Sequence, residues 1–418
     1  MDVLSLILFC ATLVIAFVFG VNSGIAAVAV SLVLSWIAGV PEKFLLSSFD
    51  SKMFLMLFGV MYLFSIAQEN KTLELLSQKT FAMCRGNAKL LPIVVFLVAA
   101  ILSGIGPGLI AVTALIAVLI VALAKEINVP AIHLAPFGLL GSFAGGLTPI
   151  TPSGVVAITS AEKSGVFGVD FILPYKMAIT CTAYAVILYF FVFKWHKKTL
   201  TGQQGTTTTP PFSAKQIATL LGVLVVAVVA TVCSISDTLP DINVGLLSLA
   251  VAVILTLFKV ADEGAALKKV PWGTLIMITG MGILISLVYD LGGIELLKNG
   301  LLALAGPKTV DAIMAVLSGV MSWFSSASGV VMPTLFPVGA EMATAMEGVD
   351  ALGVVTAVGI GSHLAAMSPL SSCGGLMLAA YSSSDITAAE RNKMFLQLFL
   401  LSGFGVLFGG ILALFGLY

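Results

Sequence analysis

Two related stretches rich in Ser, Thr, Gly and Pro carry the side chains best suited to binding chemistry. The first is GSFAGGLTPITPSG, from Gly141 to Gly154, and the second is GSHLAAMSPLSSCG, from Gly361 to Gly374. They align without a gap at an offset of 220 residues. Such a run breaks a regular helix, and unwound backbone inside a membrane is tolerated only where it is buried in protein or lines a wet cavity. Each stretch therefore predicts a broken membrane helix at a binding site.

Two further stretches place small and hydroxyl residues at the centre of long apolar segments. They read SGIGPGLIAVT, from Ser103 to Thr113, and FSSASGVVMPT, from Phe324 to Thr334, within segments 90–124 and 312–340. Each segment is too long for one straight crossing and short for two. We expect re-entrant hairpins whose tips end near the middle of the membrane, with one kinked span packed through its glycines as the alternative.

These elements predict recognition of an anion without a basic side chain. Both Arg residues, Arg85 and Arg391, fall in expected loops. A helix N-terminus offers free N–H groups and about half a positive charge, so two hairpin tips and two broken helices supply roughly +2. That charge suits a dianion such as a dicarboxylate, helix C-terminal carbonyls suit a cation, and a neutral polar substrate is the alternative that the same groups can bind. His363 is expected to lie within the membrane. A buried histidine there more commonly makes structural hydrogen bonds than it gains and loses a proton during transport.

Composition indicates that membrane helices position these residues. Of 418 residues, 59% are hydrophobic and 10% are charged, against roughly 25% charged in soluble proteins. The net charge is zero, so no nucleic acid partner is expected, and the three His and five Cys show no metal-ligand spacing. The first Lys is Lys43, so no cleavable signal peptide is expected. Apolar segments are expected at 3–19, 21–39, 53–69, 90–124, 127–161, 172–193, 214–235, 242–260, 273–289, 312–340, 351–384 and 394–416.

The chain also contains an internal repeat. From Val21 to Thr113 it matches itself at an offset of 221, which pairs Asn22 with Asn243, Gly24 with Gly245 and Gly59 with Gly280. We divide it into a first repeat (1–198), a cytoplasmic linker (199–213) and a second repeat (214–418). Five crossings in each half would invert the second half relative to the first. With both termini outside, the 20 basic residues divide 14 inside to 6 outside, as the positive-inside rule requires.

On these motifs the chain resembles the ion transporter superfamily, which includes divalent-anion:sodium symporters, malonate carriers and the large membrane subunit of tripartite periplasmic transporters. INVGLLSLAVAVI (242–254) and VNSGIAAVAV (21–30) look most like the malonate/C4-dicarboxylate carrier branch. TPITPSG (148–154) looks like the unwound segment of the tripartite subunit. The segments and the repeat predict an all-α polytopic membrane protein with an inverted repeat of two five-span halves that each have a re-entrant hairpin and a broken helix. The resemblance implies inward- and outward-opening hairpins, a mobile transport domain on a scaffold and, as is usual in the superfamily, a homodimer.

The resemblance also implies that hairpin tips and broken helices hold the substrate, with sodium sites beside it. The substrate positions carried over are Gly106, Pro107, Gly108, Thr148, Thr151, Ser153, Gly154, Ser326, Ser328, Gly329, Ser368, Ser371, Ser372 and Gly374. The sodium positions are Ser103, Gly104, Gly145, Ser325 and Ala366. The symporters carry Ser-Asn-Thr at both tips, whereas these tips read SGIGPG and SSASG, so carbonyls and hydroxyls must serve as sodium ligands.

The sequence therefore predicts an elevator-type secondary active carrier of small dicarboxylates, such as malonate or C4-dicarboxylates. We expect it to be coupled to sodium, to lie in the cell (inner) membrane and to have no enzymatic activity. One alternative is the large membrane subunit of a tripartite transporter, which needs a small membrane partner and a soluble binding protein. The third hypothesis is a channel or a membrane-embedded enzyme. A metalloenzyme would need clustered His and acidic residues in its spans.

Overall fold

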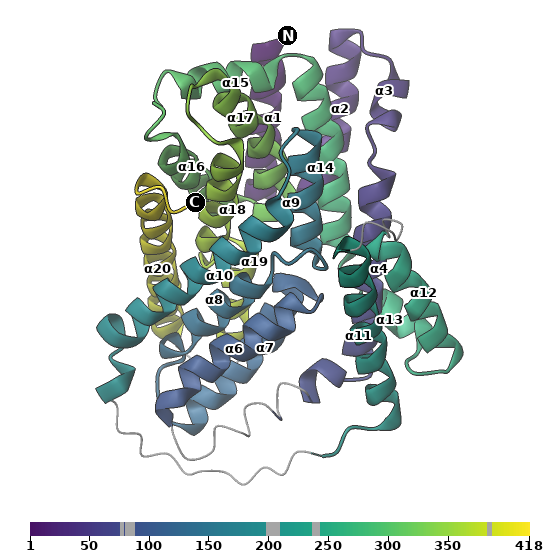
Figure 1. Cartoon of the computed structure of the whole chain (residues 1–418), viewed down its shortest axis with the longest axis vertical. Helices are drawn as coiled ribbons and strands as arrows, with labels where there is room; N and C mark the ends of the chain where they lie inside the picture. Colours follow the sequence, from purple (N-terminus) through teal and green to yellow (C-terminus); the bar gives the residue numbers. More distant parts are fainter. Residues whose placement is uncertain (76–78, 80–87, 198–209, 236–242, 383–386) are drawn as a thin grey trace.

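The computed structural model of the chain is all-helical (Figure 1). It describes residues 1–75, 79, 88–197, 210–235, 243–382 and 387–418. Within these residues, five helices are long and apolar enough to cross a membrane, or six spans if a bent pair of helices is counted as one. The prediction of a helical multi-pass membrane protein is confirmed. Most of the expected linker (199–209) lies outside the described residues.

Most of the long helices follow the expected apolar segments to within a few residues, whereas the short helices at 42–47, 263–269 and 293–302 lie outside every expected segment. In the first half they are α1 (Asp2–Phe19), α2 (Ser23–Ala38), α3 (Glu42–Ser47), α4 (Ser51–Glu69), η1 (Ala88–Leu90), α6 (Leu91–Gly104), α7 (Gly108–Glu126), η2 (Ala131–His133), α8 (Ala135–Gly145), α9 (Pro152–Lys163), α10 (Val169–Ile187), η3 (Leu188–Val192) and η4 (Trp195–Lys197). In the second half they are α11 (Ala214–Ile235), α12 (Val244–Leu257), α13 (Glu263–Lys269), α14 (Trp272–Asp290), α15 (Gly293–Leu302), α16 (Val310–Phe324), η5 (Ala327–Val331), α17 (Met332–Ala345), α18 (Ala351–Ala365), α19 (Ser372–Ser382) and α20 (Ala388–Leu414).

Both predicted broken helices are present. The first break separates α8 from α9 and the second separates α18 from α19. The expectation of unwound backbone at Ser153 and Ser372 was wrong, since these residues lie in the first turns of α9 and α19, as do Gly154 and Gly374. The closing glycines allow each helix to restart tightly against its own break. A Cβ atom on Gly154 would lie 1.9 Å from the Thr148 carbonyl oxygen, and one on Gly374 would lie 2.2 Å from that of Met367.

Helical hairpins precede both broken helices. Residues 105–107 join α6 to α7, and the two arms pack together. At this tip Gly106 and Gly108 have φ values of 134° and 79°, which favour glycine. The second hairpin bends by 120° between α16 and the helix pair η5–α17, as a broken span or a re-entrant loop does. The first hairpin's arm α7 is also long enough to count as a candidate span by itself.

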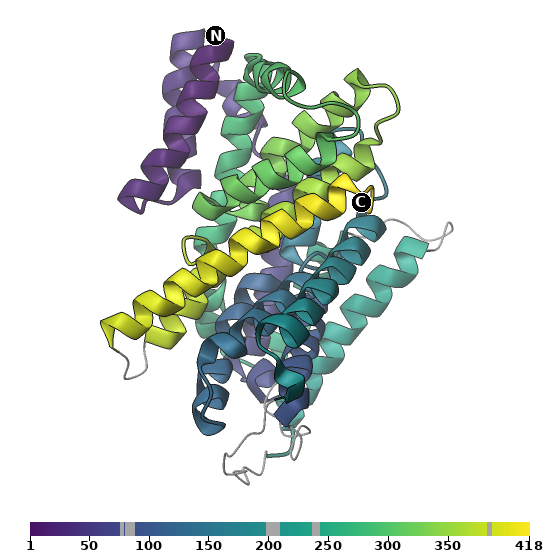
Figure 2. The same ribbon diagram turned by 90° about the vertical axis from the view of Figure 1, so that its left-hand side faces the viewer.

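The centre of the molecule is formed by α8 and α18. Every residue of α8 is buried, as are residues 353–365 of α18, which is typical of a helix that is apolar all round. Each packs against its own hairpin through a close backbone approach: Cβ atoms on Gly141 and Gly361 would lie 2.2 Å and 2.1 Å from carbonyl oxygens of α6 and α16. Figure 2 shows α20 running across α16 and α18. We call α6–α10 with α16–α20 the hairpin group.

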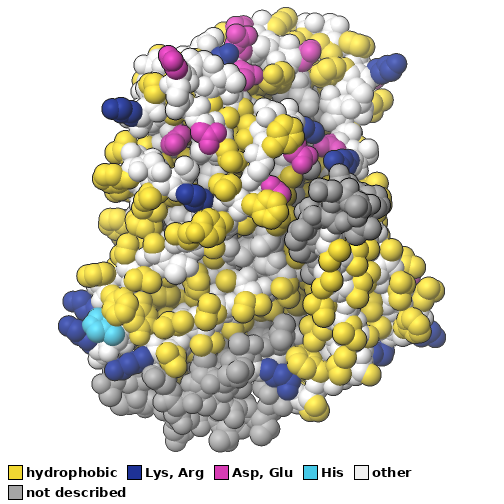
Figure 3. All heavy atoms as spheres, in the orientation of Figure 1, with side chains coloured by type: hydrophobic (Ala, Val, Ile, Leu, Met, Phe, Trp, Pro, Cys, Tyr) yellow, Lys and Arg dark blue, Asp and Glu magenta, His cyan; other side chains and the backbone are white. Residues whose placement is uncertain are grey.

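Four further helices pack in crossed pairs that join the two halves of the chain, α2 with α14 and α4 with α12. We call α1–α4 with α11–α14 the frame. Gly24 of α2 faces Gly280 of α14, and Gly59 of α4 faces Gly245 of α12, at carbonyl distances that leave no room for a Cβ atom. Small residues permit such approaches in membrane proteins. Asp and Glu side chains gather over the upper half of the face in Figure 3, whereas hydrophobic side chains cover much of its lower half.

Candidate functional site

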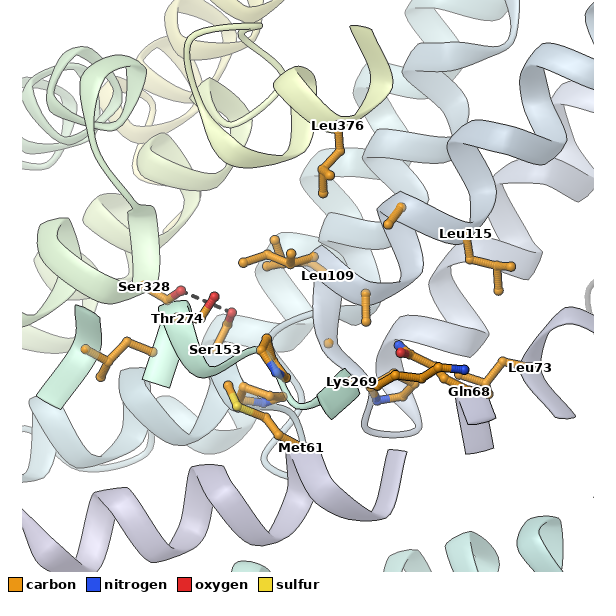
Figure 4. A pocket seen from close by; sticks show the side chains of 18 of the residues that line it. Met61, Gln68, Leu73, Leu109, Leu115, Ser153, Lys269, Thr274, Ser328 and Leu376 are labelled. Atoms are coloured by element: carbon orange, nitrogen blue, oxygen red, sulfur yellow. Dashed lines mark hydrogen bonds between the residues drawn. The ribbon is translucent and has the colours of Figure 1, made fainter. Parts of the chain in front are cut away.

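Two cavities lie between the hairpin group and the frame, each of about 400 Å³. This volume lies within the range of small-molecule sites, about 300–1,000 Å³. The first cavity (Figure 4) contacts the first hairpin tip, the first turn of α9 and one serine of the second tip, together with α4 and the α13–α14 connection of the frame. Its lining includes Pro107, Gly108, Pro152, Ser153, Ser328, Met61, Gln68, Lys269, Pro271, Thr274 and Ile278.

Three helices begin at the wall of the first cavity. The N-caps of α7 and α14 are Pro107 and Pro271, and neither N-terminus has a side-chain cap. The third helix, α9, is capped by Thr151, whose hydroxyl accepts a hydrogen bond from the Gly154 N–H at 3.1 Å. Uncapped first turns carry N–H groups without intrahelical partners, and the helix dipole favours negative charge there. The wall of the first cavity therefore suits an anion.

The two halves of the chain meet at this cavity. The Ser153 hydroxyl of α9 donates a hydrogen bond to the Ser328 hydroxyl of η5 at 3.3 Å, and both residues are buried. Figure 4 shows this pair on one side of the cavity, with Gln68 and Lys269 on the other. A broken helix of the first half and a hairpin tip of the second thus contribute hydroxyls to one point.

Four of the predicted substrate residues line the first cavity, namely Pro107, Gly108, Ser153 and Ser328. The others do not line it: Gly106, Thr148, Thr151, Gly154, Ser326, Gly329, Ser368, Ser371, Ser372 and Gly374. Several of these hydroxyls serve the backbone instead. Thr148 donates to the Gly104 carbonyl at 2.7 Å, which joins the first break to the first tip. Ser326 accepts from the Gly329 N–H at 3.0 Å, and Ser368 accepts from the Leu370 N–H at 3.2 Å.

Three of the predicted sodium positions come together at the first tip. A Cβ atom on Gly104 would lie 3.5 Å from the Gly145 carbonyl oxygen, and Ser103 is next to it in the chain. Ser103 Oγ is buried without a hydrogen-bond partner among the described residues. Ser325, at the second tip, donates to the Met321 carbonyl at 2.9 Å. Ala366 lies at the second break, where its carbonyl accepts from the Gly374 N–H at 3.0 Å.

Charged residues at the cavity walls are the feature that sequence reasoning missed. Lys269 lines the first cavity, and its Nζ lies 2.6 Å from Glu69 Oε2. Lys163 and Asp50 line the second cavity and form an ion pair at 2.7 Å. Burial of the Asp50 carboxyl opposes ionisation, but the ammonium of Lys163 and the Met53 N–H outweigh burial and lower its pKa. The sequence placed these residues at the ends of spans but carried no signal of which charges share a cavity.

The frame walls of the two cavities use matched positions of the repeat. At the offset of 221, the first cavity's Met61, Gln68, Lys269, Pro271 and Thr274 correspond to the second cavity's Gly282, Tyr289, Ser48, Asp50 and Met53. Ile278 of α14 lines both cavities, so the two spaces approach each other at this buried side chain.

Comparison with known proteins identifies the family of this chain. A profile described as citrate transporter (CitMHS) matches residues 7–361. No match was found among curated proteins. The crystal structure of the Alcanivorax borkumensis YdaH transporter is similar, with a TM-score of 0.58, 15% sequence identity, and coverage of 89% of this chain and 87% of that one. This likeness concerns the fold. The profile covers most of the chain, which therefore belongs to the citrate transporter family, a family of membrane transporters and not of enzymes.

Proposed function

We propose that this chain is a secondary active carrier of small carboxylates that works by an elevator mechanism, in which the hairpin group moves against the frame. The observation that carries the proposal is the pair of cavities built from matched frame positions. An inverted repeat exchanges the roles of its two halves when a carrier changes the side to which it opens. Two equivalent walls that approach each other at Ile278 provide the openings that such an exchange requires.

The substrate class follows from the chemistry of the first cavity. Its hydroxyls and uncapped helix starts suit carboxylates, and the family profile is named for citrate. We therefore propose small di- and tricarboxylates, including malonate and C4-dicarboxylates. Loss of one carboxylate would leave buried donors unpaired, at about 1–3 kcal/mol each. Propionate should accordingly bind at least roughly tenfold more weakly than succinate.

Sodium coupling, the homodimer and the topology are parts of the same proposal. The Ser103 hydroxyl and the carbonyl oxygens around Gly104 and Gly145 are oxygen donors of the kind that hold Na⁺ beside a substrate anion. The crossed pairs α2–α14 and α4–α12 are what two halves related by a pseudo-twofold axis would form by exchange, and we propose five crossings in each half. We place both termini outside and the linker in the cytoplasm of the inner membrane, so that the first cavity opens inward.

Uptake by the purified chain alone tests the proposal. Proteoliposomes should accumulate labelled succinate or citrate when sodium is present outside, and much less when potassium replaces it. Ser153→Ala should reduce uptake, whereas Ser47→Ala, an exposed position in α3, should not. Uptake only after addition of a soluble binding protein and a small membrane subunit would instead establish the tripartite alternative. Uptake that does not saturate with substrate would indicate a channel.

A further inference from the structure

We propose that Lys269 determines specificity at the first cavity by binding a third carboxylate of the substrate. This inference rests on the proposed function and names one residue within it. Lys269 ends α13, and among the described residues that line the first cavity it is the one basic side chain. Its side chain is 42% exposed, so a ligand in the cavity can reach the ammonium without a change of fold.

The position of Lys269 separates it from the anion-binding groups of the hairpin group, whereas the uncapped start of α14 follows Lys269 in the frame. Ser153 and Ser328 lie on one side of the cavity, and Lys269 lies on the other beside Gln68 (Figure 4). The hydroxyls and the start of α7 belong to the hairpin group, whereas Lys269 belongs to the frame. A substrate held by the hairpin group therefore meets Lys269 with a different carboxylate from those that the hydroxyls and the start of α7 bind.

Glu69 holds this ammonium in place without using all of its hydrogen-bonding capacity. One Glu69 oxygen lies 2.6 Å from Lys269 Nζ, and an ammonium has three donors. A substrate carboxylate can therefore bind beside Glu69 or replace it. Glu74 also lines the first cavity but is exposed to solvent, where water weakens its repulsion of an anion.

The repeat makes this contact specific to one cavity. The matched position in the second cavity is Ser48, which has no charge. The lysine of the second cavity, Lys163, comes from α9 of the hairpin group and is paired with Asp50. Recognition of a third carboxylate by the frame would then occur only while the substrate occupies the first cavity.

A matched pair of ligands isolates the third carboxylate. Tricarballylate is glutarate with one added carboxylate on its central carbon, so the ratio of their dissociation constants reports that group. We suggest isothermal titration calorimetry with the purified full chain and Lys269→Met, Lys269→Arg, Glu69→Gln and Lys268→Met. Lys268 is the adjacent basic residue, is exposed and does not line the first cavity.

Lys269→Met should weaken tricarballylate binding about tenfold, the loss expected for one charged hydrogen bond, and glutarate binding less than threefold. Lys269→Arg should retain most of the tricarballylate affinity, and Lys268→Met should change neither ligand. Glu69→Gln should strengthen tricarballylate binding, whereas a purely structural ion pair would make Glu69→Gln and Lys269→Met weaken binding alike.

The outcomes distinguish the inference from the proposed function. If the wild-type chain binds glutarate and tricarballylate but Lys269→Met weakens both equally, the role of Lys269 is refuted and the carrier proposal stands. The same conclusion follows if Lys269→Met and Lys268→Met behave alike. If the wild-type chain binds neither ligand, the proposed function fails and the inference fails with it.

Discussion

Replacement of Gly59 by Ala tests whether the frame is held together by close glycine crossings. The Cβ atom of the new side chain would lie 2.0 Å from the carbonyl oxygen of Gly245. Carbon contacts are favourable near 3.5–4.0 Å, so α4 and α12 must separate by about 1 Å or more. Overpacking of this kind costs about 1–3 kcal/mol. Gly24→Ala should have a similar cost at the crossing of α2 and α14, where the Cβ would lie 2.2 Å from the Ile276 carbonyl oxygen.

The measurement is the free energy of unfolding of the purified chain in mixed micelles titrated with SDS. Gly300→Ala in α15 is the matched control, because a Cβ atom there meets nothing within 4 Å. Removal of a helical glycine at an open position stabilises by up to about 1 kcal/mol. Gly59→Ala should therefore be at least about 1 kcal/mol less stable than Gly300→Ala. Equal stability of the two variants would show that the crossing accommodates a methyl group and that the reasoning is wrong.

Three other predictions concern the tips, the first break and the ion pair of the second cavity. Gly108→Val should abolish carboxylate uptake in folded protein, because φ is 79° and the Cβ would lie 2.9 Å from Pro152; near-normal uptake would remove the first tip from the site. Gly329→Val should reduce uptake less, since its Cβ would meet the flexible end of Met277 at 2.5 Å and the Ser326 hydroxyl oxygen at 3.1 Å. Thr148→Val should lower the free energy of unfolding, measured by calorimetry, by about 0.5–1.5 kcal/mol, since the Gly104 carbonyl loses its donor. Thr182→Val makes the same change at an exposed position and serves as the control. Asp50→Asn should lower stability at neutral pH by less than about 1 kcal/mol, because Lys163 is 62% exposed. The pKa of Asp50 is lowered in the folded protein, so this contribution is present at neutral pH and disappears as acid protonates the carboxylate; an acid-induced drop of the same size in wild type and Asp50→Asn would contradict it.

The sequence by itself determined the elements of the fold and its family resemblance. Pro, Gly and hydroxyl residues within apolar segments located the breaks between α8 and α9 and between α18 and α19, because no regular helix tolerates such a run. A membrane helix must satisfy its backbone hydrogen bonds internally. The lengths of the apolar segments and the positions of the breaks can therefore be predicted directly from the sequence. In the sequence, Gly24, Gly59, Gly245 and Gly280 appear only as residues paired by the internal repeat. The sequence does not show that they bring two helices into close contact.

The tertiary structure decided which of the candidate residues face a cavity. Thr148, Ser326 and Ser368 were equal candidates with Ser153 and Ser328, yet they bond to backbone atoms of the breaks and tips. The direction of a hydroxyl depends on where its turn sits relative to neighbouring helices, which local sequence does not encode. The pairing of Lys269 with Glu69 depends likewise on the packing of α13 against α4. The chemistry of the cavity wall was therefore settled by helix packing between distant segments, because only packing brings their side chains to one space.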